Sequence, residues 1–215
     1  MKALAFSGGK DSMAVLHLMR GELDCAIYVD SGYSYPETRK LVEYASTLIP
    51  MHVVKVDRGD EIPSDVVPID WTLDGQAVTS QKPFTVTSYI DCCYAHIALP
   101  LLKKAQELGV TELYNGQRNE EGHRSTSQDG AVVFGIVRRQ PIEHWTDEEV
   151  IRYLGTKMEV PSHYAIKHSS LDCYDCTAYR KDSKDRVQWM ANTHPLLFKK
   201  YQRRAMQLEQ ALRAA

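Results

Sequence analysis

Phe6-Ser7-Gly8-Gly9-Lys10-Asp11-Ser12-Met13 is the stretch from which the architecture of the chain can be predicted. Residues 2–6 before it are typical of a short buried strand, and residues 11–20 are typical of a helix. A strand that turns through two glycines into a helix favours anion binding. The glycines let backbone N–H groups approach a phosphate, and the helix start offers free donors and a positive dipole end. Lys10 can add a positive charge, and Ser7 and Ser12 can add hydroxyl donors. We therefore expect phosphate binding here; a plain glycine turn with a helix cap is the alternative.

The bulk properties narrow the class of protein. A chain of 215 residues can bury a full core as one domain, with a small C-terminal addition. The net charge of −2 does not require a nucleic-acid partner, and no apolar run approaches the length of a membrane helix. The opening residues MKALAFSGG lead straight into the loop and leave no room for a signal peptide, so we expect a cytoplasmic protein. Five cysteines in such a protein suggest metal binding or catalysis before disulfides.

Strand-like and helix-like segments alternate beyond the loop. The expected strands are residues 25–29, 52–56, 111–115 and 131–137, and the expected helices are residues 36–48, 94–108 and the stretch from Thr146 onward. This order predicts an α/β fold: a doubly wound, mostly parallel sheet with helices on both faces and a helical C-terminal portion. Pro100 should kink or divide the second helix. Residues 58–89 are expected to form a loop or short elements over the active site. We expect a nucleotide-binding domain over residues 1–160, with residues 161–215 packed on it.

Polar segments follow several of the expected strands. Because ligands of such sheets bind beyond the carboxyl ends of the strands, residues 7–12 and 30–33 are expected to share one site. Residues 116–125 contain Arg118, Arg124 and a histidine, a composition that suits sulfate or phosphate; a solvated loop is the alternative. Residues 146–149, Thr-Asp-Glu-Glu, are typical of a capping box at a helix start and are interpreted as architecture.

Three of these segments resemble one known family. Ser-Gly-Gly-Lys-Asp-Ser at residues 7–12 resembles the pyrophosphate loop of the ATP pyrophosphatase superfamily, which includes the phosphoadenosine and adenosine phosphosulfate reductases. It is neither a Walker loop nor a G-x-G-x-x-G motif. Residues 30–38, Asp-Ser-Gly-Tyr-Ser-Tyr-Pro-Glu-Thr, resemble the second signature of the reductase branch, although an Asp-Gly turn before a helix is the alternative. Residues 116–125 resemble the Gly-x-Arg loop of the reductases, whose arginines face the phosphosulfate.

The resemblance implies a set of site residues. The nucleotide-binding residues that it implies are Ser7, Gly8, Gly9, Lys10, Asp11, Ser12, Asp30 and Gly32. The catalytic residues that it implies are Lys10, Asp11, Arg118 and Arg124. The cations among them would offset the charge of a phosphate-bearing leaving group.

Four of the five cysteines form two tight pairs, Cys92-Cys93 and Cys173-x-x-Cys176. Four thiolates that converge in space suit zinc or an iron–sulfur cluster; buried reduced thiols or a redox dithiol are the other alternative. The adenosine phosphosulfate reductase type has the same two pairs and holds a [4Fe–4S] cluster with them, so the resemblance implies such a cluster here. Cys25 lies inside an expected strand and is predicted to be a core residue.

The chain departs from the reductase pattern at two places. Sulfonucleotide reductases carry a catalytic cysteine in a C-terminal Glu-Cys-Gly-[Ile/Leu]-His run, whereas no cysteine follows Cys176 in this sequence. We therefore expect no nucleophile within the chain that could attack the sulfate sulfur. Tyr94-Ala95-His96 also stands where the family has a basic residue near the cluster.

These observations leave three functions open. In the first, which the missing cysteine favours, ATP with Mg²⁺ is cleaved between its α- and β-phosphates, an acceptor oxygen is adenylated, and sulfur replaces it. In the second, adenylyl sulfate or its 3′-phosphate is reduced by a thioredoxin-like thiol donor. In the third, the chain is a non-catalytic nucleotide-binding subunit of a nucleic-acid modification complex. The basic tail would then hold the nucleic acid, unless it is only a solvated helix face. A homo-oligomer is also expected.

Overall fold

The computed structural model of the chain describes residues 1–65, 86–120, 128–165, 171, 173–178 and 184–213. The chain divides into two compact units. The first consists of Met1–Asp30, Pro36–Lys55 and Pro100–Leu171, and the second of Ser31–Tyr35, Val56–Leu99 and Asp172–Ala215. Within the described ranges, no helix is both long and apolar enough to cross a membrane.

The first unit contains a six-stranded sheet in the order β3-β2-β1-β6-β8-β7. Its strands are β1 (Lys2–Ala5), β2 (Cys25–Asp30), β3 (Met51–Lys55), β6 (Glu112–Tyr114), β7 (Val132–Val133) and β8 (Ile136–Arg139). All the strand pairings are parallel except that of β7 with β8. Strands that are buried on both faces of a sheet have continuous apolar sequences. This holds for β2, which is buried from Cys25 through Val29. The predicted α/β, mostly parallel fold is therefore confirmed.

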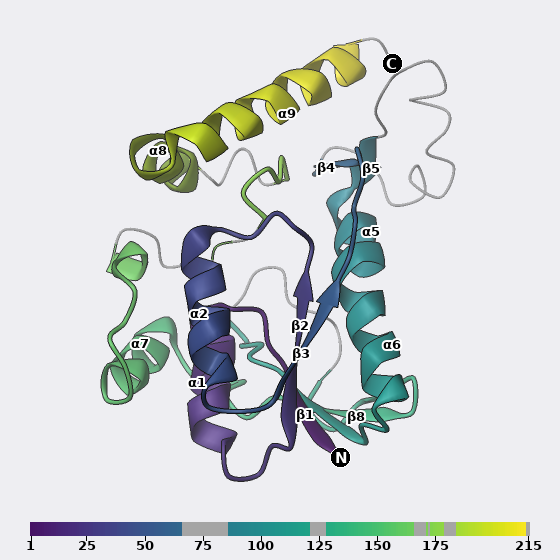
Figure 1. Cartoon of the computed structure of the whole chain (residues 1–215), viewed down its shortest axis with the longest axis vertical. Coiled ribbons are helices and arrows are strands. Elements are labelled where there is room, and N and C mark those ends of the chain that lie inside the picture. The colour runs from purple at the N-terminus through teal and green to yellow at the C-terminus, as the bar shows by residue number, and fades with distance from the viewer. Residues whose placement is uncertain (66–85, 121–127, 166–170, 172, 179–183, 214–215) are drawn as a thin grey trace. The chain divides into compact units, whose positions relative to one another are not determined.

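Helices cover both faces of this sheet. They are α1 (Lys10–Met19), α2 (Pro36–Ser46), α6 (Leu99–Glu107) and α7 (Asp147–Gly155). The side chains of α1, α2 and α7 pack with those of β1, β2 and β6 in one buried cluster, which includes Phe6, Leu16 and Val150. Figure 1 shows α6 on the opposite side of the strands from α1 and α2. The predicted capping box opens α7, because Thr146 and Glu149 exchange both hydrogen bonds.

The helix predicted over residues 94–108 begins earlier and changes its form along the way. Ser88 caps α5 (Tyr89–Cys93) by accepting a hydrogen bond from the backbone N–H of Ile90. A π-helical turn, η1 (Tyr94–Ala98), follows and leads into α6. Pro100 stands at the second position of α6, directly after η1. The helix therefore changes from the π to the α form beside this proline, which agrees with the predicted division of the helix there.

The single strand predicted over residues 131–137 is wrong. This stretch forms a hairpin instead, in which β7 pairs antiparallel with β8. Phe134 and Gly135 make its two-residue turn, with φ values of 51° and 77°. A turn of this kind needs positive φ at both central residues, which glycine adopts easily and phenylalanine does not. The sequence Phe-Gly therefore gave a weak turn signal.

The second unit is smaller, and the part of it that the structure describes is mostly helical. Its two-stranded parallel sheet pairs β4 (Ile62–Ser64) with β5 (Val86–Ser88), so short elements occur in the described part of the expected loop. Residues 66–85 of that loop lie outside the described residues. Two helices, α8 (Lys184–Thr193) and α9 (Pro195–Arg213), form the C-terminal portion. Leu208 of α9 packs against Ile62 and Val86, which fixes α9 on the small sheet.

Candidate functional site

The glycine loop lies between β1 and α1, as the sequence predicted. Gly8 has φ +77°, and a Cβ atom at this position would lie 2.6 Å from the side chain of Thr38. Both the backbone angle and the space therefore require glycine. Gly9 is the N-cap of α1 and has no side chain that could accept a hydrogen bond from the first N–H groups of the helix, so these groups need other acceptors.

Hydroxyl groups surround these amides. The backbone N–H of Gly9 donates to Oγ of Ser7 over 3.3 Å, and Oγ of Ser12 donates to the carbonyl of Gly9 over 2.9 Å. The backbone N–H of Lys10 donates to the hydroxyl of Tyr164 over 2.8 Å. Tyr164 belongs to the short 3₁₀ helix η2 (Ser162–Ala165) and is buried. Oxygen atoms of side chains thus occupy positions in which an anion's oxygens could accept the same hydrogen bonds.

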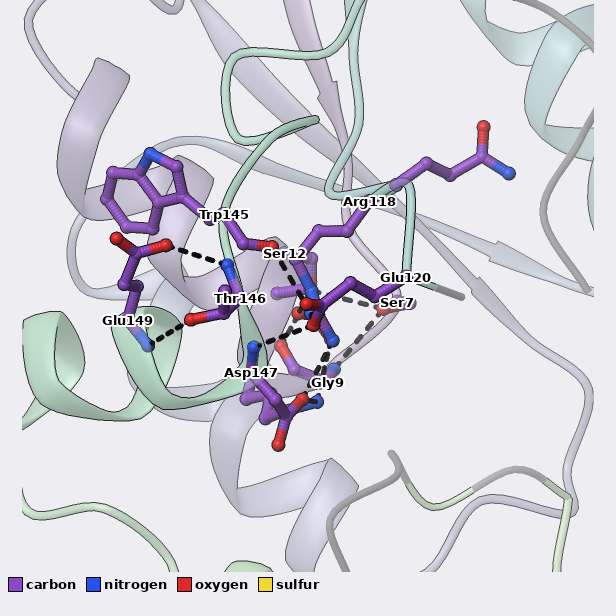
Figure 2. A network of polar contacts seen from close by, with 12 residues as sticks. Ser7, Gly9, Ser12, Arg118, Glu120, Trp145, Thr146, Asp147 and Glu149 are labelled. Atoms are coloured by element: carbon purple, nitrogen blue, oxygen red, sulfur yellow. Dashed lines mark hydrogen bonds and ion pairs between the residues drawn. The ribbon is translucent and has the colours of Figure 1, made fainter. Parts of the chain in front are cut away.

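A buried network of ion pairs lies beside the loop (Figure 2). Nζ of Lys10 lies 2.8 Å from Oδ1 of Asp147 and 3.2 Å from Oδ2 of Asp11. Arg118 donates from Nε to Asp11 over 2.6 Å and from Nη2 to Asp147 over 2.8 Å. The side chains of Lys10 and Arg118 are only 2% and 5% exposed. The two cations are therefore paired with two carboxylates, and the network joins the starts of α1 and α7 to the loop after β6.

Gly116 brings this loop against the first turn of α1. A Cβ atom at Gly116 would lie 2.6 Å from the carbonyl carbon of Asp11 and 2.8 Å from the backbone nitrogen of Ser12. Asn115 is buried just before it, and its Oδ1 accepts a hydrogen bond from the backbone of Gln117. Nδ2 of Asn115 is a buried donor that has no acceptor among the described residues. Buried donors normally have a partner, so this amide is a candidate contact for a ligand.

The remaining predicted residues fall in different places. Asp30 ends β2, which pairs with β1, so it lies at the same sheet edge as the glycine loop. Gly32 has φ +80° and belongs to the second unit. Arg124 lies outside the described residues. Sequence reasoning missed Asp147 and Tyr164. An acidic residue in a first helical turn is ordinary dipole complementarity, and a tyrosine far along the chain carries no signal of its contact with Lys10.

The four cysteines of the two pairs all belong to the second unit, and none of them forms a disulfide with a described residue. Burial raises the pKa of Cys92 to about 12, and the neighbouring Cys93 and Cys173 raise it as well, whereas Arg58 lowers it. Among the described residues, no group of three or more His, Cys, Asp and Glu side chains is arranged to hold a metal ion. The thiols of Cys92, Cys93 and Cys173 are thus near enough to interact without forming a closed metal site.

Two arginines bind the segment that contains Cys173 and Cys176. Arg186 donates to the backbone carbonyls of Cys173 and Cys176, over 3.5 and 3.0 Å. The guanidinium of Arg58 binds the carboxylate of Asp175, which lies between the two cysteines. His96, which stands where the resemblance led us to expect a basic residue, lies 3.1 Å from a carboxylate oxygen of Glu61. Positive charge is therefore present beside the thiols.

A family model and two curated relatives match most of this chain. A family model described as "Phosphoadenosine phosphosulfate reductase domain" matches residues 2–179. The phosphoadenosine 5′-phosphosulfate reductase of Photobacterium profundum is 25% identical over 164 residues, which cover 75% of this chain and 61% of that protein. The adenosine 5′-phosphosulfate reductase of Deinococcus radiodurans is 27% identical over 172 residues, which cover 77% and 60%. The chain thus spans about three fifths of the length of these two relatives.

Solved structures include more distant neighbours. The phosphoadenylyl-sulfate reductase of Candida auris, in a phosphate complex, has 18% identity and a TM-score of 0.48, covering 78% of this chain and 83% of that one. A predicted tRNA methyltransferase subunit of Methanocaldococcus jannaschii has 14% identity and a TM-score of 0.41, covering 89% and 86%. The family model, in contrast, covers most of the chain, from β1 to the segment after Cys176. This protein therefore belongs to the phosphoadenosine phosphosulfate reductase domain family.

Proposed function

We propose that the chain binds an adenine sulfonucleotide, adenylyl sulfate or its 3′-phosphate, and transfers its sulfur to a thiol. The observation that carries the proposal is the glycine loop. Gly8 needs its positive φ, Gly9 contributes no side-chain cap to α1, and Gly116 allows the neighbouring loop to touch that turn. A loop of this kind binds phosphate groups, and the named relatives of this chain are reductases of phosphate-bearing sulfonucleotides.

Several groups of the first unit would contact the phosphate of the nucleotide. The backbone amides of the loop and the hydroxyls of Ser7 and Ser12 would donate to the phosphate, and Nδ2 of Asn115 is a further buried donor beside them. Lys10 and Arg118 would offset the phosphate charge, which requires them to exchange part of their contact with Asp147 and Asp11 for the ligand. Arg124, outside the described residues, is proposed for the same role on the strength of the sequence alone.

The reaction that follows needs a second reactant. A thiolate from a thioredoxin-like donor would attack the sulfur atom, and the bond between that sulfur and the phosphate oxygen would break. The phosphate oxygen would keep the electron pair, so AMP or adenosine 3′,5′-bisphosphate would leave. A second thiol would then attack the thiosulfonate, which would release sulfite and form a disulfide on the donor. The thiols are oxidised and the sulfur is reduced, so the electrons balance.

The cysteines of the second unit have the right chemistry for a [4Fe–4S] cluster. We assign Cys92, Cys93, Cys173 and Cys176 to it, because thiolates are the ligands of such clusters and Arg58 supplies positive charge beside two of them. When bound, the cluster would supply a redox-active, negatively charged centre in this unit. Arg186 would hold the backbone of the second pair in place. Zinc is the competing metal, and iron and zinc analysis of anaerobically purified protein separates the two.

A second candidate function follows from the glycine loop itself. Amides at a helix start would bind the phosphates of ATP as well as the phosphate of a sulfonucleotide. ATP with Mg²⁺ would bind the same loop, an acceptor oxygen would attack the α-phosphate, and pyrophosphate would leave. A sulfur nucleophile would then displace AMP from the acceptor. A nucleic acid held by the basic tail is a proposed acceptor, and a nucleotide-binding subunit without catalysis is the remaining alternative.

One set of incubations tests these proposals. Sulfite and AMP should form when the protein is given adenylyl sulfate and a reduced thioredoxin, and Lys10→Ala should abolish their release. Lys40→Ala, an exposed lysine on α2, is the matched control and should be fully active. Release of pyrophosphate and AMP from ATP, without sulfite from adenylyl sulfate, would favour the second candidate instead. Tight nucleotide binding with no turnover in either assay would contradict both chemistries.

A further inference from the structure

A surface pocket of about 410 Å³ lies along helix α7 of the first unit. Its lining residues are Trp145, Glu149, Arg152, Tyr153 and Thr156. Their spacing of i, i+4, i+7, i+8 and i+11 is that of one helix face, whereas Val150 and Leu154 of the other face are buried in the core. The volume falls in the range of small-molecule sites, roughly 300–1,000 Å³.

This pocket is separate from the glycine loop. Figure 2 shows the side chains of Trp145 and Glu149 together, away from Ser7 and Gly9. Trp145 contacts the ion-pair network only through its backbone carbonyl, which accepts a hydrogen bond from Nη1 of Arg118 over 3.4 Å. The residues that line the pocket are therefore not those proposed to bind the phosphate of a nucleotide.

Two aromatic rings form the apolar wall of the pocket. The ring centres of Trp145 and Tyr153 lie 5.2 Å apart, and their planes are inclined by 72°, which is the favourable edge-to-face arrangement. Both side chains are half-buried and pack on the core beneath α7. Because these contacts hold the rings in place, the pocket offers a preformed surface against which a flat ring can pack.

Two of the three polar lining residues are engaged within α7 itself. Oε2 of Glu149 accepts a hydrogen bond from the backbone N–H of the N-cap, and the hydroxyl of Thr156 donates to the carbonyl of Tyr153 over 2.7 Å. Arg152 is exposed, and its guanidinium makes no hydrogen bond or ion pair with any residue that the structure describes. A second cation, Nζ of Lys157, lies 5.4 Å from the ring centre of Tyr153. The polar contact that the pocket offers a ligand is therefore a positive one.

We propose that this pocket binds a small aromatic carboxylate. Its ring would pack against Trp145 and Tyr153. Its carboxylate would accept hydrogen bonds from Arg152, whose planar guanidinium matches the two oxygens of such a group, and Lys157 adds positive charge beside it. An uncharged ring compound fits less well because it gains nothing from Arg152, and a cationic one would meet two positive charges.

The test is titration of the whole chain with 2-naphthoate by calorimetry, beside two ligands that each lack one of its features. 2-Naphthalenemethanol keeps the rings without the charge, and decahydro-2-naphthoate keeps the charge without aromatic rings. We expect 2-naphthoate to bind about threefold or more tightly than either ligand. Absence of 2-naphthoate binding would overturn the proposal. Equal binding of the alcohol would indicate an apolar contact surface, and equal binding of the saturated acid a site without ring recognition; either result would overturn it as well.

Substitutions locate the ligand on α7. Arg152→Gln should weaken 2-naphthoate binding about three- to fivefold, the range for an ion pair at an exposed residue, and should leave binding of the alcohol unchanged. Tyr153→Leu should weaken binding about two- to tenfold, because the ring contact is lost. Arg20→Gln, an exposed arginine of the same unit that does not line the pocket, is the matched control. Unchanged affinity in both Arg152→Gln and Tyr153→Leu would overturn the assignment.

The proposal does not rest on the reaction proposed for the glycine loop, and competition separates the two sites. Pyrophosphate should not displace 2-naphthoate, and Lys10→Ala should lose sulfite release while its affinity for 2-naphthoate persists. Displacement by pyrophosphate, or loss of 2-naphthoate binding in Lys10→Ala, would place the aromatic acid in the phosphate site and overturn the proposal. The proposed function would stand in that case, because it is measured by sulfite release.

Discussion

The backbone N–H of Lys10 and the hydroxyl of Tyr164 share a 2.8 Å hydrogen bond at the first turn of α1. The amide belongs to the glycine loop, and the tyrosine lies 154 residues further along the chain. An oxygen of the protein therefore accepts a hydrogen bond from one of the amides that a bound phosphate would use. Both residues belong to the first unit, and both are buried.

Removal of this hydroxyl should strengthen anion binding. Tyr164→Phe keeps the ring and frees the amide, so the affinity for pyrophosphate should rise two- to tenfold, in line with about 0.5–1.5 kcal/mol for one hydrogen bond. Calorimetric titration with pyrophosphate measures it, with Tyr44→Phe, far from this amide in the sequence, as the control. Weaker binding by Tyr164→Phe would mean that the hydroxyl itself contacts the anion.

The carboxylate of Asp147 should stabilise the fold and weaken the binding of anions. Asp147→Asn removes the carboxylate that pairs with Lys10 and Arg118, so the free energy of unfolding should fall by about 1–3 kcal/mol. The loop also becomes more positive, so pyrophosphate should bind more tightly. Urea unfolding and titration measure the two effects. Glu148→Gln, the exposed next residue on α7, should change neither; an Asp147→Asn protein as stable as the wild type would contradict the role of the network.

Gly116 should tolerate no side chain. Gly116→Ala places a methyl group 2.6 Å from the backbone of Asp11, where neither chain segment can move without disturbing the loop. We expect a loss of about 1–3 kcal/mol in unfolding free energy, together with weaker phosphate binding. Gly155→Ala at the end of α7 meets no atom within 4 Å and should be neutral or slightly stabilising. Equal stability of the two variants would contradict the close approach.

The cluster assignment predicts a colour. Protein purified without oxygen should be brown and contain iron and sulfide, and Cys173→Ser should bleach it. Cys25→Ala should keep the colour, because Cys25 is buried in β2 of the other unit. Colourless protein that contains stoichiometric zinc would contradict the cluster assignment and indicate a zinc site instead.

The sequence predicted the parts of the fold that local signals specify. The two glycines marked the turn between β1 and α1, and Thr146 with Glu149 marked the start of α7. The hairpin at Phe134 was missed because phenylalanine rarely adopts a positive φ, so its position carried no turn signal. The pairing of Lys10 with Asp147 was missed because it joins the starts of two helices that only the tertiary fold brings together.

The candidate site shows the same contrast between local and tertiary signals. Ser7, Gly8 and Gly9 could be proposed as phosphate contacts from the motif alone, because glycines and hydroxyl residues at a helix start favour anion binding. That Lys10 and Arg118 are already paired could not be predicted, since opposite charges far apart in a sequence show no partner. The pocket along α7 likewise depends on which face of that helix the rest of the fold leaves uncovered.

The most direct test of the central claim is a crystal structure with adenylyl sulfate bound. We predict density for its phosphate at the backbone amides of Gly8, Gly9 and Lys10, with the hydroxyl of Tyr164 moved away from the Lys10 amide. A glycine loop without a ligand, in crystals where the nucleotide binds only elsewhere on the chain, would contradict the account.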